Sequence, residues 1–190
     1  MKQSILLTVL LFILTSTSYS FDGQRKGFVL GGGLGICAVS HWSVNVDFYD
    51  LDVADANEER VGLGLHILIG GSFDEHNMLI YESNVSGFNS ELLNESIGQG
   101  FSGAAWYHYF SSAGNSAFTA LGLGFYQFKV GDYDATNPGG ALLLGAGYEF
   151  SRHWQIGAYL TFGKTTESAF GLNADFEHAN LSILISGIAY

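Results

Sequence analysis

Eight stretches of about twelve residues, in which apolar side chains alternate with small or polar ones, run through this chain. Alternation with a period of two is typical of β-strands that have one apolar face. The predicted strands cover residues 26–38, 60–73, 77–88, 97–110, 116–129, 139–150, 154–165 and 178–190. The pattern therefore indicates an all-β fold, in which a single sheet accounts for most of the chain.

The seventh predicted strand shows the alternation clearly. Trp154, Ile156 and Leu160 share one face, and the residues between them are polar, small or aromatic with a hydroxyl. A continuous apolar face suits a membrane barrel, whose outer surface meets lipid while its inner surface is small or polar. The fourth and eighth strands are ambiguous, because Trp106 falls on the predicted inner face and Tyr190 does not share the parity of its apolar neighbours.

The connections between the predicted strands alternate in length. The short ones are 74–76, 111–115 and 151–153, and the long ones are 39–59, 89–96, 130–138 and 166–177. Outer-membrane barrels have an even number of strands, short periplasmic turns and longer external loops. The chain is therefore predicted to form an eight-stranded antiparallel up-and-down transmembrane β-barrel with both termini in the periplasm.

Residues 1–20 have the features of a secretory signal peptide. A lysine precedes an apolar run of ten residues at 5–14, and Ser18 and Ser20 form a small-x-small cleavage site. The apolar run is too short for a spanning helix, which needs about 20 such residues. We expect a signal peptide at 1–20 and a barrel domain at 21–190, exported to the outer membrane of a Gram-negative bacterium.

The composition agrees with a membrane protein that lacks spanning helices. Mean hydropathy is +0.21 and only 13% of residues are charged, yet no later apolar run is long enough for a helical span. Backbone groups in lipid must be hydrogen-bonded internally, which a closed barrel achieves. A soluble β-sandwich or lipocalin-like barrel would also alternate, but its outward face would be polar.

The net charge of −11 disfavours nucleic-acid binding, and the single cysteine, Cys37, excludes an intrachain disulfide.

Three segments carry a family resemblance: FDGQRKGFVLGGGLG after the predicted signal, FTALGLGFYQF, and the last strand, which ends in Tyr190. They resemble the OmpX/OmpA-type eight-stranded barrels of the outer membrane protein beta-barrel domain family, over residues 21–190. The resemblance implies that Tyr190, in place of the usual terminal phenylalanine, is read by the barrel-assembly machinery, and we expect it to face lipid. The family includes adhesins, structural anchors, narrow pores and lipid-modifying enzymes, so the resemblance implies no single activity.

Polar residues on the predicted inner face form the candidate site. They are Arg60, His66, Glu82, Asn84 and Glu149, with His108, Tyr126 and Tyr159 on the same face. Tight pairing across the turn at 74–76 places His66 opposite Asn84 and diagonal to Glu82. This histidine–carboxylate pair fits either a general base with its orienting acid or a polar plug that closes the lumen. Arg25 and Glu149 share inner-face parity near the periplasmic end, and we expect an ion pair between them.

The first long connection, 39–59, carries six acidic residues and no lysine or arginine. Hard cations prefer clustered oxygen ligands. The candidate ligands for weak binding of Ca²⁺ or Mg²⁺ are therefore Asp47, Asp50, Asp52 and Asp55. The segment lacks the glycine and spacing of an EF-hand loop, and the alternative is a solvated surface of repelling charges. Val44 and Val46 alternate with polar residues, which favours a hairpin that rises above the membrane.

These observations favour a protein with a structural or adhesin-like role, without catalysis and without a cofactor. One alternative is a narrow pore for small solutes. Another is a lipid-modifying enzyme, for which His41 and Ser43 form the only His-x-Ser arrangement. The expected partners are outer-membrane lipid and lipopolysaccharide, the barrel-assembly machinery, and divalent cations at the acidic loops.

Overall fold

The computed structural model describes residues 24–48, 51–133, 135–169 and 172–190. For residues 47–48, 51–55, 168–169 and 172, it describes the backbone alone. The predicted signal peptide lies outside the described residues and stays a prediction. Within the described part of the chain, no helix has the length and apolar character needed to cross a membrane.

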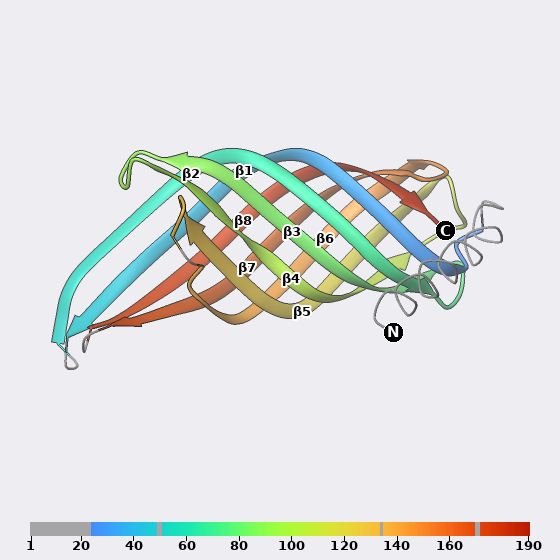
Figure 1. Ribbon diagram of the computed structural model, residues 1–190. Helices are drawn as coiled ribbons and strands as arrows, with labels where there is room; N and C mark the ends of the chain where they lie inside the picture. Colours follow the sequence, from blue (N-terminus) through green and yellow to red (C-terminus); the bar gives the residue numbers. More distant parts are fainter. Residues whose placement is uncertain (1–23, 49–50, 134, 170–171) are drawn as a thin grey trace, which may run out of the picture.

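Eight antiparallel strands form a closed barrel, in which each strand pairs with its neighbour in sequence and β1 pairs with β8 (Figure 1). The strands are β1 (Gly27–Phe48), β2 (Leu51–Ser72), β3 (Asn77–Ser90), β4 (Glu95–Tyr109), β5 (Ser116–Val130), β6 (Asn137–Ser151), β7 (Trp154–Ala169) and β8 (Leu172–Ala189). The predicted all-β up-and-down architecture is confirmed. We call the end with the three short connections and the C-terminus the turn end, and the opposite end the loop end.

The first and last hairpins extend beyond the others at the loop end (Figure 1). Most of the predicted loop 39–59 is a paired ladder that continues β1 and β2, and most of the predicted loop 166–177 continues β7 and β8 in the same way. A register shift between Cys37 and Ser40 interrupts the ladder of β1 with β2. Inward-facing positions of β1 are odd-numbered up to Cys37 and even-numbered from Ser40 onward, because the extra residue forms a bulge.

The outward face of the barrel is an apolar belt. Its exposed members include Leu34, Ile36, Val61, Leu63, Leu65, Leu121, Leu123, Leu142, Leu144, Ile183 and Ile185. A soluble protein rarely exposes such a contiguous apolar surface, whereas a transmembrane barrel requires it. The soluble sandwich and lipocalin-like alternatives are therefore rejected.

The inward and outward faces of β4, and the orientation of the last residue, differ from the prediction. Trp106 is 46% exposed on the outward face, and His108 shares that face, whereas Tyr107 and Tyr109 are buried inside the barrel. The expectation that Tyr190 faces lipid is wrong, since this residue is 0% exposed. Aromatic residues occupy both faces of β4, so hydropathy alone does not distinguish its inside from its outside.

Inward-facing glycines make room for the inward-facing aromatic rings. A Cβ atom added to Gly145 would lie 2.7 Å from Cδ1 of Tyr159, and one added to Gly163 would lie 2.3 Å from Cβ of Tyr126. An eight-stranded barrel is only wide enough for side chains to fill its interior. The glycines inside the strands therefore serve packing, and they explain how the lumen accommodates many large rings.

Candidate functional site in the barrel lumen

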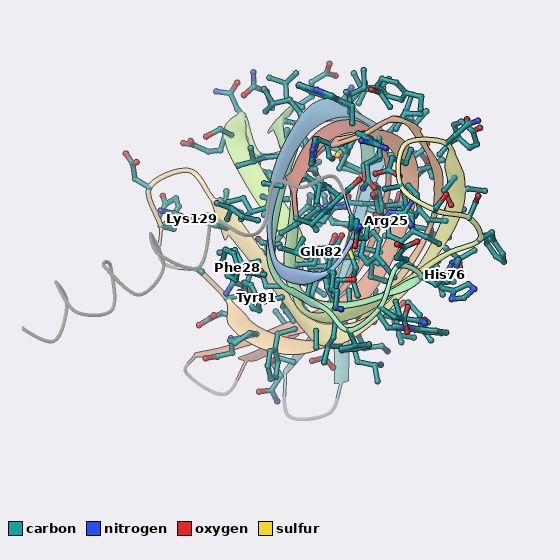
Figure 2. All side chains as sticks on the ribbon, turned by 90° about the vertical axis from the view of Figure 1, so that its right-hand side faces the viewer. Arg25, Phe28, His76, Tyr81, Glu82 and Lys129 are labelled. Carbon is teal, nitrogen blue, oxygen red and sulfur yellow. The ribbon has the colours of Figure 1, made fainter. Side chains whose placement is uncertain are left out.

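Arg25, two residues before β1, closes the turn end of the lumen. Its side chain is fully buried, and Figure 2, which looks from this end, shows it inside the ring of strands. The guanidinium donates hydrogen bonds to the carbonyl oxygens of Glu75 at 2.6 Å, Ser111 at 2.9 Å and Ser112 at 3.2 Å. Its Cζ lies 3.8 Å from the centroid of the Tyr109 ring. Arg25 thus ties the start of the barrel to two separate turns.

Glu149 on β6 balances the charge of Arg25. Its Oε2 accepts hydrogen bonds from Nη2 of Arg25 at 2.5 Å and from the backbone N–H of Gly114 at 2.8 Å. The hydroxyl of Tyr190 donates to Oε1 of the same carboxylate. The predicted contact between Arg25 and Glu149 is therefore present, and its additional hydrogen bonds offset much of the desolvation cost of two buried charges. We call Arg25, Glu149 and Tyr190 the turn-end lock.

A second polar network, centred on His66, lies farther along the lumen. The strand register pairs His66 with Asn84, as predicted. Nε2 of His66 lies 2.9 Å from Oε1 of Glu82, and Nδ1 lies 3.1 Å from the hydroxyl oxygen of Ser186. Oε2 of Glu82 accepts a hydrogen bond from the hydroxyl of Tyr107 at 2.8 Å. The histidine and the carboxylate therefore have partners on both sides.

Ser186 completes a serine, histidine and carboxylate series, which is the composition of many nucleophilic sites. It approaches His66 because both residues pair with Gly33, whose missing side chain leaves them in contact across β1. A hydrolytic site needs room for an acyl group beside the serine. Here the serine is 1% exposed, and a Cβ added to Gly33 would lie 2.2 Å from its hydroxyl oxygen. The packing thus favours the polar plug over the general base.

An aromatic lid fills the loop end of the lumen. It consists of the buried residues Trp42, Phe88, Ile97 and Phe128, with Val44, Val130 and Phe176 packed against them. The ring of His178 stacks on Tyr126 with centroids 4.7 Å apart, and its Nε2 lies 2.9 Å from the hydroxyl oxygen of Thr165. Sequence reasoning missed the lid because Trp42 and Phe176 fall in segments predicted as loops.

Arg60 lies partly exposed at the rim, apart from the buried networks, so the predicted inner-face set does not form one cluster. Its Nε lies 2.9 Å from Oε1 of Glu58, and its Nη2 lies 2.7 Å from Oε2 of Glu91. Burial alone would raise the pKa of Glu58, but hydrogen bonds from Ser90, Arg60 and the backbone N–H groups of Glu91 and Leu92 lower it to about 2. This rim clasp, Glu58 with Arg60, holds β2 against the β3–β4 connection.

The remaining candidates lie outside the lumen. The side chains of the weak metal candidates fall outside the described residues: Asp47, Asp50, Asp52 and Asp55. Among the side chains that are described, no group of three or more His, Cys, Asp or Glu could hold a metal ion. His41 and Ser43 are half-buried on the face of β1 opposite to Trp42.

The closed eight-stranded sheet, the apolar belt and the filled interior define the class of the fold. It is that of the small eight-stranded β-barrels known from bacterial outer membranes. No protein-family model and no curated protein sequence matches the chain.

Three solved structures illustrate the similarity. The outer membrane protein OprG from Pseudomonas aeruginosa is 12% identical, with a TM-score of 0.52 over 90% of this chain and 98% of that chain. Neisserial surface protein A is 11% identical, with a TM-score of 0.50 over 85% of this chain and 96% of that one. The outer membrane protein AlkL, solved in lipid bilayers, is 10% identical, with a TM-score of 0.51 over 87% of this chain and 91% of that chain. At such identities the similarity establishes the fold alone.

Proposed function

We propose that this protein resides in the bacterial outer membrane, has no catalytic activity, and has a structural or adhesin-like role at the cell surface. The filled lumen is the observation that carries the proposal. The turn-end lock, the network around His66 and the aromatic lid occupy the interior with side chains that contact each other. The apolar belt supports insertion into a membrane.

Function would then reside in the parts that project from the barrel. We propose that the loop end faces the cell exterior and that both termini are periplasmic, because short turns are periplasmic in barrels of this type. The extended hairpins β1–β2 and β7–β8 then stand above the membrane. Val44 and Phe176, which pair across β1 and β8, help to line a hollow of about 450 Å³ formed by the four strands of these hairpins. Lipopolysaccharide and outer-membrane lipid around the belt, and divalent cations at acidic loops, remain the proposed partners.

Planar-bilayer conductance tests the closed lumen. Purified barrel that shows the folded, heat-modifiable band on gels should give no stable single-channel steps. Steps whose size changes with Glu82→Gln would instead establish the narrow pore. The enzymatic alternative is tested separately by incubating the barrel with lipopolysaccharide, and the lipid masses should stay unchanged.

A trimmed variant tests the surface role. Removing residues 45–55 shortens the β1–β2 hairpin and keeps the ladder below the pair of Asn45 with Asp55. The variant should still fold and insert, but attachment of cells to matrix-coated glass should fall. Equal attachment by both forms would count against an adhesin-like role of this hairpin and leave the structural role.

A further inference from the structure

The middle of the lumen, between the network around His66 and the aromatic lid, is lined by small polar residues. The buried members of this mid-lumen layer are Cys37, Ser40, Asn84, Ser86, Thr161, Asn180 and Ser182. Large rings, such as Tyr159 and Phe128, fill the lumen on either side of it. The layer therefore gathers small side chains with hydrogen-bonding groups in the middle of the barrel.

Three buried polar atoms in and beside this layer lack a hydrogen bond of normal geometry, although two of them are hydroxyls that lie close enough to interact with each other. They are Nδ2 of Asn84 and the hydroxyl oxygens of Tyr126 and Thr161. The three residues are 0–1% exposed. The ring of Tyr126 is held by stacking on His178, so its hydroxyl cannot turn toward solvent. Buried polar groups in native proteins are almost always paired with protein or with ordered water.

The strand register brings these three atoms to the same part of the lumen. Asn84 and Tyr126 are both cross-strand neighbours of Phe101. The hydroxyl of Ser182 on β8 donates to Oδ1 of Asn84 at 3.4 Å, which links β3 to β8 across the interior. Thr161 pairs with Asn180, two residues from Ser182 along β8. The three groups therefore come from β3, β5 and β7 and converge on the mid-lumen layer.

We propose that the mid-lumen layer is a water-binding site, in which ordered water bridges Nδ2 of Asn84 and the hydroxyls of Tyr126 and Thr161. A buried water typically makes about three hydrogen bonds, and these three groups offer donors and acceptors in that number. No ionised carboxylate, lysine or arginine belongs to the layer, which disfavours a bound ion. The site goes beyond the proposed surface role, because it concerns what completes the interior rather than what the hairpins bind.

Water-to-protein NMR cross-relaxation on the refolded, isotope-labelled full barrel tests the site. The side-chain amide of Asn84 should show a cross-peak to water, with the sign expected for a bound molecule. The cross-peak should weaken or vanish in Thr161→Val, which removes one hydroxyl and keeps the side-chain shape. It should persist in the matched control Thr165→Val, because that hydroxyl already pairs with His178. Both variants are first checked for the folded, heat-modifiable band.

Two results would overturn the proposal. One is the absence of any cross-peak between water and Asn84 in the unmodified protein. The other is a cross-peak that keeps its full intensity in both Thr161→Val and Tyr126→Phe. A rise in the urea unfolding midpoint of Thr161→Val would also count against the bound water, since replacing a buried hydroxyl that has no well-formed hydrogen bond by a methyl group is stabilising.

Discussion

Arg25 and Glu149 depend on each other inside the turn-end lock. Removing one partner of a buried ion pair leaves the other uncompensated, so Arg25→Met should lower the free energy of unfolding by about 3–5 kcal/mol. Glu149→Gln should also lower the free energy of unfolding. The double variant should lose less of this free energy than the sum of the losses in the two single variants. Urea unfolding in lipid vesicles measures this cycle. Agreement with additivity within about 0.5 kcal/mol would show that the two side chains are not coupled.

Tyr190 combines a stabilising contact with its predicted assembly role, and two variants separate them. Its hydroxyl donates to buried Glu149, and its ring packs 4.9 Å from that of His153. Tyr190→Phe keeps the aromatic end but should lose about 1.5–3 kcal/mol, as for a hydrogen bond to a charged group. Its yield in the outer membrane should stay normal. Deleting the residue should reduce the heat-modifiable band, and an unchanged band would refute the assembly role.

Glu58 gives the rim clasp a defined pH dependence. It lies beyond Val61, the last exposed apolar residue of β2 among the side chains that the structure describes, and its folded-state pKa of about 2 is below the ordinary value of 4.5. A lowered carboxyl pKa stabilises the fold above pH 4.5, and this contribution is lost as the pH falls toward 2. Hydrogen-exchange protection of the Leu92 amide should therefore decrease in that window. Glu58→Gln should lower the hydrogen-exchange protection of the Leu92 amide already at pH 7. The control Glu59→Gln, at a residue that faces outward, should leave this protection unchanged.

At the scale of a strand, two glycines of β6 should respond differently when each is replaced by leucine. Gly140 faces outward, and a Cβ there meets nothing within 4 Å, whereas a Cβ at Gly145 would lie 2.7 Å from the ring of Tyr159. Gly140→Leu should be tolerated in the lipid-facing wall. Gly145→Leu should cost at least about 1–3 kcal/mol, as overpacking of a filled core does. Equal unfolding midpoints for both variants would contradict the inside–outside assignment of this strand.

The strands also show which features can be derived from sequence. Outward leucines and isoleucines are large and continuous on β1, β2, β6 and β7, so a period of two predicts their faces. The contact of His66 with Glu82 follows from the tight turn, because a hairpin register propagates along two neighbouring strands. The contact with Ser186 crosses β1 at Gly33 and depends on the closure of the barrel. The aromatic lid depends on closure too, since its rings come from four strands.

The whole molecule is asymmetric along the barrel axis, because the turn end is locked and the loop end carries two long hairpins (Figure 1). In a membrane, the apolar belt admits two orientations that differ only in which end is outside. Outer-membrane barrels of known structure keep their short turns in the periplasm and their longer connections outside the cell. We therefore expect the connection between Phe48 and Leu51 to lie outside the cell.

An epitope inserted in that connection tests the orientation. The site interrupts no pair of the β1–β2 ladder, since Phe48 pairs with Leu51 at its end. Antibody should bind intact cells that carry this insertion. A matched epitope in the connection after Tyr109 at the turn end should react only after the outer membrane is permeabilised. The reverse pattern would invert the topology, and the acidic hairpins would then face the periplasm, where they could not serve a surface interaction.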